Sequence, residues 1–276
     1  MPSDTQHYYL PAPSWWPIVG SLSLLLLAAG FALLLQKMTA GVYVMIAGGL
    51  LLAYMLVGWF GAVIREGRQG LFNRQVDRSY RWGMGWFIFS EVMFFAALFG
   101  ALFYARQFAV PWLGDTPLLW PDYTAEWPTA GPGAQQPFTP MAAWGIPAIN
   151  TMILLSSGLT VTWAHWGLKN DNRLQVKLGL GLTILLGIIF LALQVHEYQS
   201  ADFSLSTGIY GATFYLLTGF HGAHVTLGAI MLSVILGRVF AGHFSSGHHF
   251  AFEAVSWYWH FVDVVWLLLF VFVYWF

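Results

Sequence analysis

Acidic side chains stand inside long apolar stretches of this sequence. Glu91 interrupts the apolar segment 82–105, and Asp263 interrupts the apolar segment 254–276. An ionisable residue at such a place is a functional candidate by default, although it can also hydrogen-bond a neighbouring helix and fix its packing. We therefore predict that Glu91 is either a proton-exchanging carboxyl or a packing residue, and the sequence leaves both interpretations open.

His260 precedes Asp263 by one helical turn, so the two side chains can share a face and form a hydrogen bond. Such a pair can be half of a metal site, a proton wire, or a mutually neutralised pair that locks helix packing. We favour the last interpretation, because a buried pair needs mutual satisfaction in any case.

His221 and His224 repeat the same spacing. A metal would need further ligands at fixed geometry. The nearby Gly219, Gly222 and Gly228 indicate a close-packed helix face instead. We therefore predict structural histidines at both positions.

A donor-rich cluster follows the apolar segment 203–237. It contains Arg238, His243 and Ser245, with His248 and His249 close behind. At headgroup depth such a cluster can recognise an anionic lipid phosphate, or it can be an ordinary solvated loop.

The overall composition indicates which class of protein holds these residues. The chain has 276 residues, of which 58% are hydrophobic and 8% charged, with a net charge of −1 and a mean hydropathy of +0.64. A soluble domain carries about 25% charged residues, and a disordered chain has far less apolar surface. The net charge of −1 does not indicate binding to nucleic acid. The absence of cysteine excludes disulfides and thiolate-ligated metals.

We predict an all-α membrane protein that forms a single transmembrane domain over residues 1–276. A bilayer span needs about 20 apolar residues. Uncharged or nearly uncharged stretches of that length predict seven transmembrane helices, near residues 16–36, 39–64, 82–106, 142–166, 176–197, 208–237 and 251–276. Residues 111–140 are rich in Pro and Gly and predict an extramembrane loop.

The positive charges predict the orientation. Nine of the eleven Lys and Arg residues fall on one side of the predicted spans, and two fall on the other. The N-terminus is therefore expected on the cytoplasmic side and the C-terminus on the periplasmic side. We expect no cleavable signal peptide.

The histidines do not match a known redox-metal pattern. Membrane di-iron oxygenases need several histidine boxes, and the sequence offers one imperfect box from His243 to His249. The spacing also differs from that of a haem–copper catalytic subunit. The residues therefore predict a redox-silent membrane subunit with no metal ligands.

Several motifs resemble subunit III of the aa3-type cytochrome c oxidases. They cover almost the whole chain in order, and the last is the most specific. The matching segments are 63–66 (VIRE), 81–84 (RWGM), 87–95 (FIFSEVMFF), 163–165 (WAH), 208–211 (GIYG), 218–225 (TGFHGAHV), 248–253 (HHFAFE) and 257–266 (WYWHFVDVVW).

The resemblance implies a non-catalytic core subunit of a proton-pumping oxidase, which supports proton uptake and the stability of the catalytic subunit. Its fold has two helices and a five-helix bundle around a V-shaped cleft that holds phospholipids. Haem and copper belong to the partner subunits I and II. Glu91 falls at the carbodiimide-reactive carboxyl of the family. The residues that would line the lipid cleft are Trp59, Arg65, Glu66, Arg238, His243 and Ser245.

The first two helices are usually absent from related quinol oxidases, so the resemblance favours cytochrome c as the electron donor. The length of the loop at 111–140 favours a bacterial inner membrane. Three alternatives stay open: a stand-alone membrane enzyme with a histidine-ligated metal, a quinol-oxidase subunit III, and a proton carrier built around Glu91.

Overall fold

The computed structural model is all-helical over the described residues, which are 9–133 and 138–275. Seven of its helical segments are long and apolar enough to cross a membrane, so the prediction of an integral membrane protein with seven spans is confirmed. The elements are α1 (Trp16–Leu35), α2 (Ala40–Arg68), α3 (Arg74–Tyr104), η1 (Ala105–Ala109), α4 (Val110–Gly114), α5 (Ile146–Lys169), α6 (Arg173–Ser200), α7 (Gly208–Phe240), α8 (Phe250–Leu269) and η2 (Phe270–Trp275).

The third span is longer at both ends than the sequence predicted. It runs without a break from Arg74 through η1 and α4 to Gly114, whereas the prediction was 82–106. The first residues of the predicted loop 111–140 are therefore helical. Pro111 lies just after the π-helical turn η1 and has no N–H to donate, so the hydrogen-bond ladder of the span is interrupted there although the segment stays helical. Residues 134–137 of that loop, and residue 276 of the last predicted helix, lie outside the described part of the chain.

The chain divides into two compact units, residues 1–80 and 81–276. The first unit holds α1 and α2, and the second holds most of α3 together with α5 to α8. The V-shaped cleft that the resemblance implies would lie between the units and stays a prediction.

Small residues bring α1 and α2 of the first unit together. Gly30 and Gly41 face each other so closely that an added Cβ on Gly41 would lie 2.7 Å from the carbonyl oxygen of Gly30. Gly48 makes a similar approach to Leu27. Because lipid tails are as apolar as leucine, close backbone packing of this kind joins membrane helices where burial of apolar surface cannot. Large apolar side chains point outward, including those of Leu24 and Leu25.

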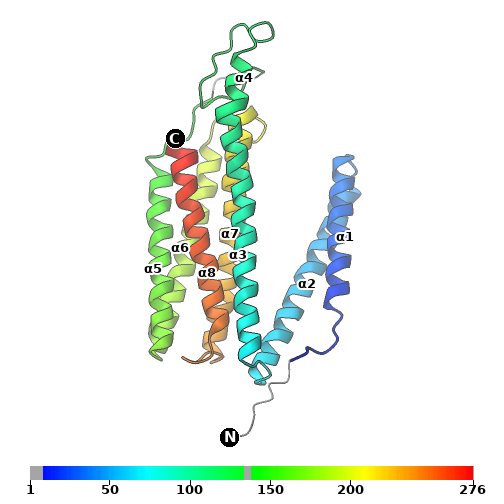
Figure 1. The fold of residues 1–276 in the computed structure, drawn as a ribbon, viewed down its shortest axis with the longest axis vertical. Coiled ribbons are helices and arrows are strands. Elements are labelled where there is room, and N and C mark those ends of the chain that lie inside the picture. Colours follow the sequence, from blue (N-terminus) through cyan, green and yellow to red (C-terminus); the bar gives the residue numbers. More distant parts are fainter. Residues whose placement is uncertain (1–8, 134–137, 276) are drawn as a thin grey trace. The chain divides into compact units, whose positions relative to one another are not determined.

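In the second unit, α3, α5, α6, α7 and α8 run side by side as a bundle (Figure 1). Trp259 of α8 is fully buried at its centre. Its ring fits against two glycines, since a Cβ added to Gly187 of α6 or to Gly228 of α7 would lie within 2.8 Å of it. The indole N–H donates to the hydroxyl of Ser157 on α5 at 2.9 Å, so one side chain joins four helices.

The glycine-lined face predicted on α7 is therefore correct at one position. Gly228 is closely packed, but Gly219 and Gly222 have open space where a Cβ would stand. The three residues are not on one face: at 3.6 residues per turn, position 228 lies about two and a half turns from 219 and about one and two-thirds turns from 222, so it points away from both. Gly228 is closely packed because the ring of Trp259 lies against it, and the spacing of the glycines along the sequence does not show where Trp259 lies.

Between Gly114 and Ile146 the described residues form turns and extended segments. This loop is attached to the start of α7. The amides of Ile209 and Tyr210 donate to the carbonyls of Ala130 and Thr129 at 3.3 and 3.2 Å. Gly208 has a φ of 79°, and a Cβ there would strike the carbonyl oxygen of Ala130, so this junction requires glycine.

Candidate functional site

A carboxyl–imidazole pair joins α3 to α7. Oε2 of Glu91 lies 2.8 Å from Nε2 of His224, and both side chains are largely buried, at 23% and 14% exposed. The sequence singled out both residues but did not pair them, since they are 133 positions apart. The pairing depends on how α3 and α7 face each other, and no local pattern carries that information.

The hydrogen bonds of His224 place one shared proton in this pair. Nδ1 lies 2.6 Å from the carbonyl oxygen of Phe220, which can only accept, so Nδ1 carries a hydrogen. A contact of 2.8 Å between Nε2 and Oε2 then requires one proton between them. The pair is therefore either an imidazolium with a carboxylate or an imidazole with a carboxylic acid, and a proton can be exchanged at these two atoms.

Aromatic rings enclose the pair. Phe94 and Tyr258 stack on the imidazole of His224, with centroids 6.0 and 6.4 Å away. Phe95 and Phe261 meet it at steeper angles. These rings keep bulk water away, which strengthens any electrostatic interaction between Glu91 and His224.

We expect Glu91 and His224 to be energetically coupled. In a double-mutant cycle with Glu91→Ala and His224→Ala, the coupling should lie between about 0.6 and 1.7 kcal/mol, the average and the maximum for hydrogen bonds within membranes. Graded denaturation of the purified protein measures it. Val92→Ala is the matched control, because Val92 is next to Glu91 on α3 and its side chain is 45% exposed. Additive single-mutant effects would show that the pair contributes nothing.

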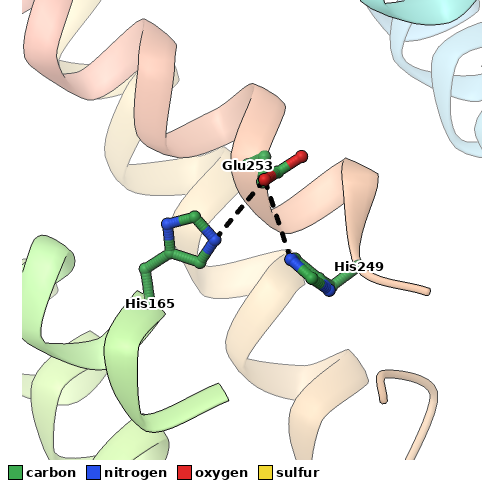
Figure 2. Close-up of side chains that lie close together, drawn as sticks. All are labelled: His165, His249 and Glu253. Carbon is green, nitrogen blue, oxygen red and sulfur yellow. Dashed lines mark ion pairs between the residues drawn. The ribbon is translucent and has the colours of Figure 1, made fainter. Parts of the chain in front are cut away.

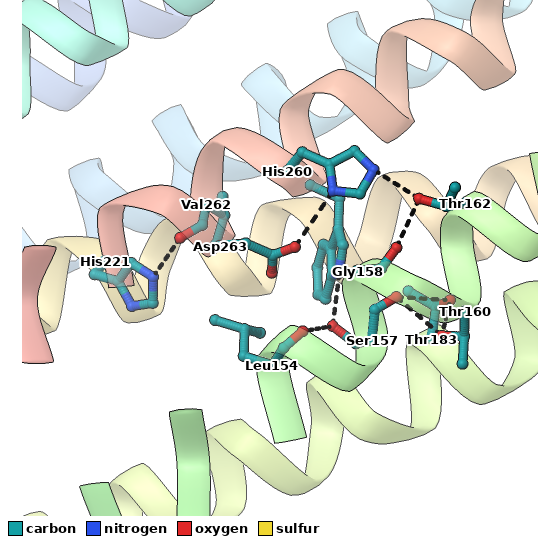
Figure 3. Close-up of polar contacts among 11 residues, drawn as sticks. Leu154, Ser157, Gly158, Thr160, Thr162, Thr183, His221, His260, Val262 and Asp263 are labelled. Carbon is teal, nitrogen blue, oxygen red and sulfur yellow. Dashed lines mark hydrogen bonds and ion pairs between the residues drawn. The ribbon is translucent and has the colours of Figure 1, made fainter. Parts of the chain in front are cut away.

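His221 does not join His224. It is buried in the bundle, where its Nε2 lies 3.1 Å from the carbonyl oxygen of Val262 (Figure 3). Its ring packs against Phe190 and Trp266. The surroundings of His221 fit a structural role, whereas His224 points to α3.

His260 and Asp263 lie close together, as their spacing indicated, but they are not equally buried. Nδ1 and Oδ2 are 3.5 Å apart, and the side chains are 44% and 8% exposed. The hydroxyl of Thr162 donates to Gly158 at 2.9 Å, so Nε2 of His260 donates to that hydroxyl at 3.2 Å (Figure 3). The carboxylate of Asp263 packs directly on Gly158, so this pair also holds α8 against α5.

Sequence reasoning missed a second buried acid. Glu197 of α6 is 2% exposed and accepts hydrogen bonds from Gln194 at 2.7 Å and from Tyr274 at 2.9 Å. Asn150 of α5 reaches the same network through Gln194. Glu197 falls at the end of a predicted helix, where an acid is usually solvated. The nearby Gln194 in an otherwise apolar segment was the signal available.

The predicted lipid-contact residues fall in both units. Trp59, Arg65 and Glu66 lie on α2 of the first unit, and Trp59 is half exposed. Glu66 lies beside Tyr9; desolvation and this neighbouring carboxylate raise the pKa of the Tyr9 hydroxyl. Whether these residues act together with those of the second unit stays a prediction.

In the second unit, Arg238 is in the last turn of α7, and its guanidinium lies 4.4 Å from the centroid of the Phe244 ring. His243 and Ser245 follow in the turn that leads to α8. This turn is held by two hydrogen bonds between the backbones of Ser245 and His248. The three predicted lipid-contact residues of this unit thus belong to one short, ordered connection.

The histidine box seen in the sequence is not a unit in the structure. His248 is exposed, whereas His249 turns inward toward Glu253 of α8 and His165 of α5 (Figure 2). Within the described residues, this is the group of three side chains whose ligand atoms are close enough to hold a metal ion. Neither His165 nor Glu253 was predicted as a candidate ligand.

Comparison with known proteins places this arrangement in a family. The family model described as cytochrome c oxidase subunit III matches residues 6–276. The chain belongs to the cytochrome c oxidase subunit III family. The resemblance read from the motifs is thereby confirmed.

Its relatives align over their full length. The protein named cytochrome c oxidase subunit 3 from Danio rerio is 42% identical over 278 residues, covering 100% of this chain and 99% of the relative. The proteins of the same name from Dugong dugon and Pongo pygmaeus are 43% and 42% identical, with the same coverage. The aligned region therefore includes all seven spans of this chain.

Proposed function

We propose that this chain is a non-catalytic core subunit of a proton-pumping aa3-type cytochrome c oxidase in a bacterial inner membrane. It assembles with subunits I and II, which carry the haem and copper, and cytochrome c donates electrons to the complex. The observation that carries the proposal is the family match over the whole chain, including both helices of the first unit.

The carboxyl–imidazole pair supports a role in proton uptake. Glu91 and His224 share one proton, and both side chains keep some exposure at the surface of the bundle. Such a pair can pass a proton without changing the net charge of the site. In this role the chain assists proton delivery to the catalytic subunit and does not carry the redox chemistry.

Purification through a tag on this chain tests the assignment. We expect haem a, copper and the two larger subunits to co-purify, with oxidase activity that uses reduced cytochrome c. A preparation that oxidises quinol and not cytochrome c would support a quinol-oxidase subunit III. Iron or copper held by this chain in the absence of other subunits would support a stand-alone metalloenzyme and end the proposal.

Phospholipid binding is the second part of the proposed function. Helices α1 and α2 bury mainly small residues against each other and expose large apolar side chains, so acyl chains must cover them. Arg238 at the end of α7 is a suitable partner for a lipid phosphate, since a juxtamembrane cation attracts anionic headgroups by about 1 kcal/mol.

We expect Arg238→Ala to lower the number of phospholipids that survive purification with the complex. Turnover should begin near the normal rate and then decline sooner, because the lipid stabilises the assembly. Quantitative lipid mass spectrometry measures the first effect, and activity followed over time measures the second. Arg238→Lys keeps the charge and should retain the lipid; equal lipid counts in all three proteins would remove Arg238 from the site.

A further inference from the structure

Three side chains at one end of the second unit bring metal-binding atoms together. His165 lies near the end of α5, His249 caps the start of α8, and Glu253 is in the first turn of α8. Both imidazoles turn toward the same carboxylate (Figure 2). Each Nε2 lies 3.7 Å from Oε1 of Glu253, and the three ligand atoms all lie within 4.8 Å of one another.

The spacing leaves room for one ion. A separation of 3.7 Å is too long for a hydrogen bond. Zinc lies about 2.0–2.2 Å from nitrogen and oxygen ligands, so two ligands of a tetrahedral zinc are about 3.3 Å apart. Closing the two 3.7 Å gaps to Glu253 therefore needs a shift of a few tenths of an ångström, and the two imidazole nitrogens, which lie within 4.8 Å of each other, must approach by up to about 1.5 Å. Nε2 of His165 is buried without a hydrogen-bond partner, which is unusual for a buried polar atom unless something else satisfies it.

Neighbouring contacts fix the ligand atoms in a metal-binding state. Nδ1 of His249 lies 3.2 Å from the carbonyl oxygen of Ser245, so Nδ1 donates and, in the neutral imidazole that binds a metal, the lone pair of Nε2 faces Glu253. Arg81 of α3 holds the other carboxylate oxygen, with Nη1 2.6 Å from Oε2. Contacts of this kind orient ligating imidazoles and carboxylates around metal ions in proteins.

The donor chemistry indicates the class of ion. Two imidazole nitrogens and one carboxylate oxygen suit zinc and similar divalent transition metals better than magnesium or calcium, which prefer oxygen. The cationic side chains of Arg81 and Lys169 lie near the site and weaken the binding of a dication. The three ligand side chains are nevertheless at most 18% exposed, so an ion would be held away from bulk water.

We propose that His165, His249 and Glu253 bind one divalent transition-metal ion, with zinc the best fit, and that Arg81 positions the carboxylate. The proposal departs from the sequence prediction that this chain has no metal ligands. It does not depend on the proposed function, because a metal that links α5 to the start of α8 would act on the structure of this chain alone.

Equilibrium dialysis tests the site. The protein is purified from membranes with the partners it retains, stripped with a chelator, and dialysed against free Zn²⁺. Zinc is then measured by mass spectrometry per copy of this chain. We expect His165→Ala and His249→Ala each to bind one zinc fewer than the unmodified protein. His248→Ala is the matched control, since that imidazole is adjacent but exposed, and it should bind as much zinc as the unmodified protein.

Glu253→Gln provides a variant of nearly the same shape whose amide oxygen can face Arg81 but which lacks the anionic ligand. It should weaken zinc binding at least tenfold. Zinc X-ray absorption of the loaded protein should show imidazole ligands that disappear in His249→Ala. Equal zinc binding by the unmodified protein, His249→Ala and Glu253→Gln would overturn the proposal. Loss of zinc in His248→Ala, but not in His249→Ala, would do the same, because it would place the ion on the exposed surface.

Discussion

Trp259→Ala should cause the largest loss of stability of any single truncation in the bundle. The indole is fully buried and packs on Gly187 and Gly228, so its removal leaves a cavity that rigid neighbouring helices cannot fill. We expect the free energy of unfolding to fall by about 3 kcal/mol, the lower end of the range for tryptophan truncation. In a membrane, an apolar side chain that leaves the bundle meets lipid and not water, so its burial in the protein contributes less.

The complex is heated to a series of temperatures, and the fraction that stays intact is measured by size-exclusion chromatography. The temperature at which half of the complex is lost should be lower for Trp259→Ala. Trp166→Ala is the matched control: Trp166 is on α5 and is 59% exposed, so its loss leaves no cavity. Trp259→Phe keeps an aromatic ring in the core but loses the hydrogen bond to Ser157. Its midpoint temperature should lie between those of Trp259→Ala and Trp166→Ala. Equal midpoints for Trp259→Ala and Trp166→Ala would contradict the central role of this side chain.

Gly179→Leu should separate α6 from α5. An added Cβ at Gly179 would lie 2.7 Å from Cβ of Ala164 and 2.9 Å from the carbonyl oxygen of Thr160. A backbone oxygen cannot move aside as a flexible side chain can, so the helices must shift. Overpacking typically costs 1–3 kcal/mol, and we expect at least about 2 kcal/mol here because the contact is with backbone.

Gly181→Leu is the matched control for this prediction. Gly181 is on the same helix and has nothing within 4 Å of an added Cβ, so leucine there should point into lipid at little cost. The change in helix propensity is the same in both variants and cancels in the comparison. The heating assay used for Trp259 gives both values, and similar midpoints for the two glycine variants would show that α5 and α6 are not closely packed at Gly179.

The two ends of the third span show what a local hydropathy pattern can predict and what it cannot. The apolar stretch predicted a third helix from residue 82, but α3 begins at Arg74 and the following segments continue to Gly114. Hydropathy reports the part of a helix that is immersed in lipid. It does not report residues 74–81 at the start of α3, which are charged and still helical. Residues 107–114 at the other end are uncharged and helical, although Pro111 indicated a loop.

Single polar residues in apolar segments were identified from the sequence, but their partners were not. Glu91 was a candidate, yet its contact with His224 joins the third span to the sixth. His249 was read with His243 and His248, whereas the fold brings it to His165 and Glu253. The rotation of each helix about its axis decides which side chains meet, and that rotation depends on packing along the whole bundle.

The sequence by itself determined that this protein is an all-helical membrane protein with seven spans, because the length and hydropathy of each segment are local properties that the bilayer selects directly. Its ordered motifs also determined the family. The tertiary structure alone decided that Glu91 shares a proton with His224, that Trp259 lies on Gly187 and Gly228, and that two histidines meet Glu253. These contacts come from close packing between helices, which depends on the shapes of many distant side chains together.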